Sequence, residues 1–167
     1  MPGQEPWLRG TDLGVDAFIA PTLFAFEQAR EDLAHWTEGL TDEQMWARPH
    51  GIAPLGFQIR HIAGSVERLT TYLQGDQLSD AQVQAARDEQ NPGDLSRAAL
   101  FELLDRAMSA SEGVLRALDP ARLADKREVG RKKLPTTVAG LLVHIAEHTA
   151  RHVGEAIITA KVVRGGA

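Results

Sequence analysis

The chain has 167 residues, 43% of them hydrophobic, which is enough for one domain with a sizeable core over residues 1–167. Its net charge of −5 argues against a nucleic-acid-binding protein, and the absence of cysteine excludes disulfides, thiolate metal sites and a cysteine nucleophile. No apolar run reaches membrane-spanning length and no signal peptide is visible, so we expect a cytoplasmic protein without a membrane partner.

Hydrophobic residues at helical spacing predict four long helices joined by short connections. The first covers residues 21–39, where Pro21 suits an opening helical turn. A capping-box pattern then predicts a short helical turn at 41–46. The second long helix covers 54–74, begins at Pro54 and is followed by a glycine that suits a C-terminal cap.

The second half of the chain contains the two other long helices. A further capping box predicts a short helix over 79–90, and Asp94 or Ser96 caps the third long helix. Residues 120–135 are polar, show no convincing strand pattern and are expected to be irregular. The last long helix covers about 137–163 and is capped by a threonine. Four long helices without strands indicate an all-α four-helix bundle with short connecting helices.

Three of the six histidines, His144, His148 and His152, lie four residues apart in the last predicted helix. Residues at this spacing stack along one helix face, and neutral imidazole is a common ligand for zinc, nickel, copper and iron. With a rise of about 1.5 Å per residue, the outer two are about 12 Å apart, too far to share one ion. An adjacent pair can bind an ion, as in the zinc-binding H-x-x-x-H pattern, if the remaining ligand comes from elsewhere.

A helical wheel at about 100° per residue distinguishes the two adjacent pairs. His152 lies at the edge of the apolar stripe of this helix, and His148 lies next to it. His144 is rotated further out, toward Glu147 and Arg151. The pair His148 and His152 is therefore expected to face the interior, with His144 at the rim of any site.

A fourth histidine, His61, lies in the second long helix. It forms a line with Ser65, Arg68 and Tyr72, roughly a third of a turn from the buried stripe, and Gly64 beyond this line allows a close approach by a neighbour. Such a helix can pack on one side and line a cleft on the other. Arg68 and Tyr72 are either a packing and hydrogen-bonding pair or the residues that hold a polar or anionic substrate.

Two further features have a functional and an ordinary interpretation. Glu155 shares the face of His148 and His152, where it is an exposed charge, a hydrogen-bond acceptor for a ligand histidine or an occasional ligand. The basic stretch at 126–133 is either a solvated loop or a region that draws a small anion toward the start of the last helix.

The segments GFQIRHIAGSVERLTTYL and LLVHIAEHTARHVGEAI together resemble the DinB/YfiT-like superfamily. The likeness extends from the first long helix to the last, and the paired histidines are its most specific part. The resemblance implies a four-helix bundle, often a homodimer, with a divalent metal ion bound by His61, His148 and His152. Many members have glutamine at the position of Glu155, where a glutamate adds negative charge.

The resemblance also implies a reaction class. Some relatives are transferases that use a low-molecular-weight thiol, so we expect a thiol-dependent S-transferase or a hydrolase acting on a small-molecule substrate. The metal would be zinc or nickel, and three neutral ligands would leave its full charge to lower the pKa of a bound thiol or water. The thiol must come from a cosubstrate, because the chain has no cysteine. Glu155 and His144 are the candidates for proton transfer.

Two other hypotheses remain open at this point. In the first, the protein is a non-catalytic bundle that a metal stabilises, and it serves as a dimerisation or small-molecule-binding module. Loss of the metal should then unfold it. Alternatively, no metal binds and the histidines only line a small-molecule pocket.

Overall fold

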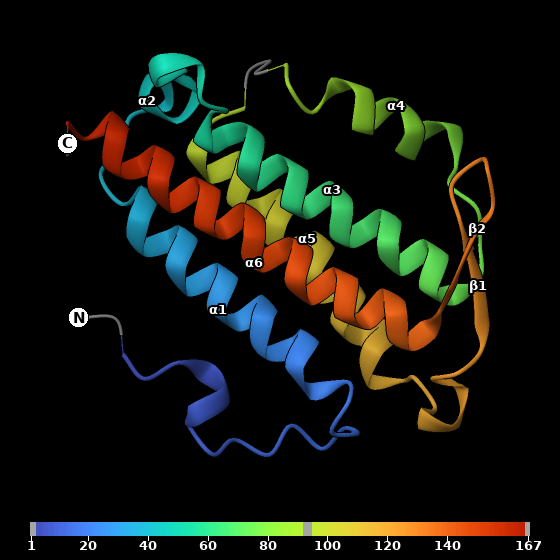
Figure 1. Ribbon diagram of the computed structural model, residues 1–167. Helices are drawn as coiled ribbons and strands as arrows, with labels where there is room; N and C mark the ends of the chain where they lie inside the picture. The colour runs from blue at the N-terminus through green and yellow to red at the C-terminus, as the bar shows by residue number, and fades with distance from the viewer. Residues whose placement is uncertain (1–2, 92–94, 166–167) are drawn as a thin grey trace.

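Four long helices form the body of the computed structural model, which describes residues 3–91 and 95–165 (Figure 1). They are α1 (Ala20–Thr37), α3 (Leu55–Gln74), α5 (Arg97–Arg116) and α6 (Val138–Val163). Short helices α2 (Asp42–Trp46) and α4 (Asp80–Asp88) connect them, with 3₁₀ turns at Pro6–Leu8, Pro49–Gly51 and Pro120–Arg122. The prediction of an all-α four-helix bundle is confirmed.

Capping side chains set the helix ends close to where the sequence predicts them. Capping boxes form at Thr41, before α2, and at Ser79, before α4. The Ser96 hydroxyl caps α5, whereas Asp94, the other candidate, lies outside the described residues. Thr137 caps α6, with its hydroxyl accepting a backbone hydrogen bond from the first turn. Each cap satisfies backbone N–H groups that have no partner within the helix.

The core lies where the apolar stripes of the four long helices meet. Helix α6 packs against both α1 and α3, and α3 also packs against α5 (Figure 1). Phe26, Ile62, Leu104 and Ile145, one from each long helix, are fully buried. Burying each such side chain stabilises the fold by about 1.5–3 kcal/mol, so the bundle has an apolar core that does not depend on polar groups.

Helix α4 returns along the bundle, because α3 and α5 run in the same direction (Figure 1). It lies antiparallel on α3: Gln82 near its start donates to Thr71, and the carbonyl of Asn91 beyond its end accepts from Arg60. The return therefore brings Glu89, at the end of α4, back to the middle of α3.

A small β-hairpin joins α5 to α6, so the expectation that residues 120–135 are irregular was wrong in part. Strands β1 (Lys126–Val129) and β2 (Leu134–Thr137) pair antiparallel. Four-residue strands are too short to show a clear alternation of polar and apolar residues, and β2 contains a proline.

Arg127 explains why this segment has a fixed place in the fold. Its Nε donates to the carbonyl of Leu73 at 2.7 Å, at the C-terminal end of α3, where helix carbonyls lack partners. Arg127 is buried, while Arg131, Lys132 and Lys133 at the turn are exposed. The basic stretch is thus a solvated turn with one structural arginine.

Over the two described ranges, no helix has both the length and the apolar character needed to cross a membrane.

Candidate metal centre

Three histidine rings converge between α3 and α6. His61, His148 and His152 each offer a ring nitrogen, and these nitrogens lie within 4.8 Å of one another. The ring centroids are 4.4 Å apart for His61 and His152 and 4.5 Å apart for His148 and His152. Two nitrogens bound to one ion are at most about 4.2 Å apart, twice the metal–nitrogen bond length. Small rotations of these half-buried rings would therefore close a site around one ion.

A buried carboxylate fixes the orientation of the His61 ring. The Nδ1–H of His61 donates to Oε2 of Glu89 at 2.6 Å, and the Glu89 side chain is only 7% exposed. The other carboxylate oxygen, Oε1, accepts from Arg68. With the hydrogen on Nδ1, the lone pair of His61 is on Nε2, the nitrogen available to an ion.

Gly64 lets this ion pair lie against α3. A Cβ at position 64 would be 2.5 Å from Oε1 of Glu89 and 2.6 Å from Nη1 of Arg68, closer than real Cβ contacts. The expectation that Gly64 allows a close approach by a neighbour is confirmed. Any larger residue here would displace the groups that hold His61.

A neutral amide fixes the orientation of the His152 ring. Its Nδ1–H donates to Oε1 of Gln58 at 2.7 Å, and the amide nitrogen of Gln58 donates to Glu155 at 2.9 Å. Gln58 is 1% exposed, whereas the Glu155 side chain is 49% exposed. Glu155 also lies 3.4 Å from Nδ1 of His152, so it acts on this ring mainly through the shorter contact with Gln58. His152 therefore also has its lone pair on Nε2.

Burial keeps two of the three rings neutral. Loss of solvent, together with the positive charges that His152 and His61 would carry, lowers the pKa of His148 to about 4. Burial also lowers the pKa of His152. Because only a deprotonated nitrogen can bind a metal, a lowered pKa makes both rings available at neutral pH. Neutral imidazoles are ligands that suit zinc, nickel and other divalent transition ions, so the donor set fits such an ion.

His144 lies at the rim, as the helical wheel predicts. Its side chain is 47% exposed and its Nδ1 contacts Glu147 at 2.8 Å, while Glu147 also accepts from Arg151. The ring centroid is 5.3 Å from that of His148. His144 thus neighbours the three-histidine group without belonging to it.

The structure separates the other residues of the His61 line. Arg68 donates to Glu89 and to the hydroxyl of Ser65, which itself lies 3.4 Å from Nε2 of His61. Tyr72 is buried in the core, eleven residues from His61 and thus about 16 Å along the helix. Arg68 is brought close to the three-histidine group and Tyr72 is not.

Sequence reasoning missed two residues that orient the histidine rings, Gln58 and Glu89. Gln58 precedes His61 by three residues, so its position on the same side of α3 was available from helical spacing. Glu89 carries no local signal, because it reaches His61 only through the return of α4 along α3. A buried glutamate at the end of a polar helix looks like any exposed acid in the sequence.

The fold is a helical bundle, and its three half-buried histidines form a group that is compatible with metal binding. The family model of the DinB superfamily matches residues 25–156, which includes all three histidines. The chain belongs to the DinB superfamily. The search of curated proteins found no match.

Proposed function

We propose that this protein is a metal-dependent enzyme whose divalent ion is bound by His61, His148 and His152. The observation that supports the proposal most directly is the orientation of the rings. Two of them direct Nδ1–H into hydrogen bonds with Glu89 and Gln58, leaving Nε2 of each for an ion. Histidines that only packed in a core would not need two separate partners to fix the same tautomer.

The proposed reaction is an S-transfer from a low-molecular-weight thiol to a small electrophilic substrate, or alternatively a hydrolysis. A divalent ion with three neutral ligands keeps its full charge, and so supplies a lowered pKa to a bound thiol or water and polarises a carbonyl. The thiol must be a cosubstrate, because the chain has no cysteine. Zinc and nickel are the proposed metals.

Two exposed groups are placed to handle protons. Glu155 has half of its side chain in solvent, and Gln58 holds one of its oxygens beside His152. We assign Glu155 as the proton acceptor and His144, at the other end of the histidine line, as a second proton-transfer group. Arg68 has a positioning role instead of binding substrate, since its guanidinium is engaged by Glu89 and Ser65.

A catalytic ion is favoured over a purely structural one by the core. The bundle is closed by apolar side chains that are fully buried without any ion, whereas the ligand rings are only half buried. A structural ion contributes its binding energy to folding. We therefore expect chelation to remove the metal with little change in Tm; a large fall in Tm would favour the metal-stabilised module.

The homodimer and the cytoplasmic location stay predictions.

The test is metal analysis of protein purified without a histidine tag. The wild type is expected to hold about one ion per chain, as three ligands for one ion require. His148→Ala should lose it, while the matched variant His144→Ala, one turn away on the same helix, should keep it. Unchanged metal in His148→Ala would remove His148 from the site. A screen of small thiols against electrophilic acceptors, with the metal-loaded protein, then tests the reaction.

A further inference from the structure

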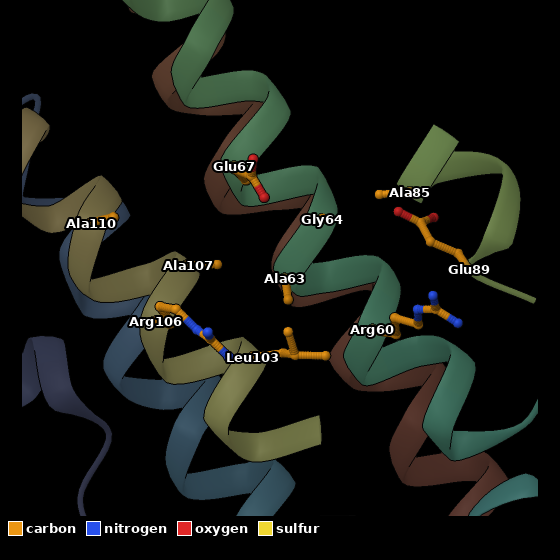
Figure 2. A pocket seen from close by; sticks show the side chains of 10 residues that line it. All are labelled: Arg60, Ala63, Gly64, Glu67, Ala85, Glu89, Leu103, Arg106, Ala107 and Ala110. Atoms are coloured by element: carbon orange, nitrogen blue, oxygen red, sulfur yellow. The ribbon is translucent and has the colours of Figure 1, made fainter. Parts of the chain in front are cut away.

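A cavity lies over one face of α3, with α5 on one side of it and α4 on the other, and the three histidines do not line it (Figure 2). Its volume is about 520 Å³, within the range of about 300–1,000 Å³ typical of small-molecule sites. Small or apolar residues form most of the lining: Ala63, Gly64, Ala85, Leu103, Ala107 and Ala110. The cavity therefore has an apolar body that could hold the chain of a small ligand.

The space exists because polar contacts hold α4 in place near its two ends. Gln82, in its first turn, donates to Glu67 and Thr71 of α3. Glu89, just after its last turn, contacts Arg68 and His61. None of the nine residues of α4, all of them described, is buried. The helix thus lies beside α3, and its side chains leave open the space between it and the alanines of α5.

Glu89 separates this cavity from the metal centre. The α3 residues that line the cavity, centred on Ala63 and Glu67, lie roughly a third of a turn from His61 on the helical wheel. The carboxylate of Glu89 lines the cavity and also contacts His61 and Arg68. A ligand in the cavity would therefore lie on the other side of Glu89 from His61, and not among the three rings.

The charges around the cavity are unequal at its two ends. Arg60 and Arg106 lie at the same end, with Leu103 between them; the Arg106 side chain extends toward Leu103, and the Arg60 side chain extends away from it (Figure 2). Arg60 donates one N–H to the carbonyl of Asn91, and a guanidinium has five N–H donors in all. Within residues 3–91 and 95–165, Arg106 makes no hydrogen bond or ion pair with another side chain or the backbone. Glu67, held by Gln82, lies toward the other end.

We propose that this cavity is a second binding site, for a small monocarboxylate with a short apolar body. The carboxylate would accept hydrogen bonds from Arg106, with Arg60 adding positive charge at the same end, and the apolar body would lie over Ala63 and Ala107. Guanidinium groups bind carboxylates through paired, charge-assisted hydrogen bonds, and a cationic end beside an apolar floor selects against a cationic ligand.

The test uses octanoate as the probe and octylammonium, of similar length and opposite charge, as its control. Binding to the full chain is measured by calorimetry, and backbone ¹⁵N chemical shifts locate it. Octanoate should bind and shift resonances of α3, α4 and α5, and octylammonium should bind much more weakly. Equal binding of the two probes, no octanoate binding, or shifts confined to other helices would overturn the proposal.

Variants decide whether the cavity residues carry the binding. Arg106→Gln should weaken octanoate by about threefold to tenfold, as expected for one exposed ion pair with an added hydrogen bond. Arg131→Gln, an equal charge change in the exposed hairpin turn, should have no effect. Ala107→Phe should fill the space and abolish binding. If that variant fails to fold, the two arginine variants decide, because both side chains are exposed.

One further arm separates this site from the metal centre, since a carboxylate could also bind an ion. The octanoate titration is repeated on His148→Ala and on chelator-treated wild type. Unchanged affinity in both supports the cavity, whether or not the proposed metal function is correct. Affinity that falls with metal loss but not in Arg106→Gln would place the carboxylate at the ion and overturn the second site.

Discussion

Two of the three clustered histidines, His61 and His152, each have a hydrogen-bonded partner, and these two arms of the proposed metal centre differ in charge, burial and origin. His61 is oriented by Glu89, a buried carboxylate from a separate helix whose own charge is balanced by Arg68. His152 is oriented by Gln58, a neutral amide, and the carboxylate Glu155 lies beyond it at the surface. One arm thus places a charge in direct contact with a ligand, and the other keeps the charge one residue away in solvent.

This difference suggests a division of tasks. A carboxylate hydrogen-bonded to a ligand histidine raises the basicity of its free nitrogen and fixes its ring, which favours metal binding. A carboxylate that is half exposed is less useful for binding but is free to exchange protons with water and substrate. We therefore expect changes on the His61 arm to reduce metal affinity, and changes at the end of the His152 arm to reduce activity.

The largest effect is expected for Glu89→Gln. This change removes the charge beside His61 and leaves the guanidinium of Arg68 facing an amide, so Zn²⁺ affinity should fall by about 10–100-fold. The free energy of unfolding should fall by about 1–3 kcal/mol, because Arg68 loses its buried partner. Competition with a chelating dye measures the affinity, and urea unfolding of metal-free protein measures the stability.

The control for this variant is Glu67→Gln, which removes an exposed charge from the same face of the bundle. It should leave Zn²⁺ affinity unchanged. Equal losses in the two variants would mean that net negative charge, and not the hydrogen bond to His61, accounts for the effect.

Gly64→Ala should act in the same direction by a steric route. The added methyl group would overlap the contact between Glu89 and Arg68, so the pair has to separate or α4 has to shift. We expect Zn²⁺ affinity to fall by about tenfold, the lower end of the range for a disturbed partner of a ligand histidine. The measurement is the same dye competition.

Gly113→Ala is the matched control, because nothing lies within 4 Å of a Cβ at that position of α5. Alanine should stabilise this helix by about 0.5–1 kcal/mol and leave metal binding unchanged. If Gly64→Ala also stabilised the protein without loss of affinity, the contact between Glu89 and Arg68 would not be needed by the metal centre.

Gln58→Leu breaks the other arm and should have a moderate effect. The His152 Nδ1–H loses its acceptor, but no charge is removed and the leucine keeps the volume of a buried side chain. Zn²⁺ affinity should fall by about tenfold or less. A loss greater than that for Glu89→Gln would contradict the view that the charged arm contributes more to metal binding.

How much of this site the sequence predicts depends on whether a contact lies within one helix. The choice of His148 and His152 over His144 follows from helical spacing, and so does the second face of α3. Glu89 could not be predicted, because its place depends on the path of a connection between two parallel helices. The hairpin at 126–137 was missed for a related reason, because it is also fixed by a contact between residues distant in the sequence. Its two strands pair with each other, and Arg127 in the first strand donates to the end of α3.

Tyr72 illustrates the limit of the wheel itself. It lies at nearly the same angle around the helix as His61, but a helical wheel does not show distance along the helix axis. Tyr72 lies about three turns away from His61, in the core. Arg68 is nearer along the helix and reaches the centre because its long side chain extends back toward Glu89. Angle and side-chain length together decide which residues of a helical line meet.

The smallest effect on metal binding is expected for Glu155→Gln, which restores the residue that the family resemblance leads us to expect at this position. A glutamine oxygen can still accept from the amide of Gln58, so the His152 arm stays in place. Zn²⁺ affinity should change by less than about threefold, as for an exposed charge. If Glu155 is the proton acceptor, kcat should nevertheless fall, because the glutamine amide cannot take up the proton. Glu147→Gln, an exposed acid on the same helix that contacts His144, tests whether any nearby charge would do the same. A kcat unchanged in Glu155→Gln but lowered in Glu147→Gln would move the proton acceptor to the His144 side of the site.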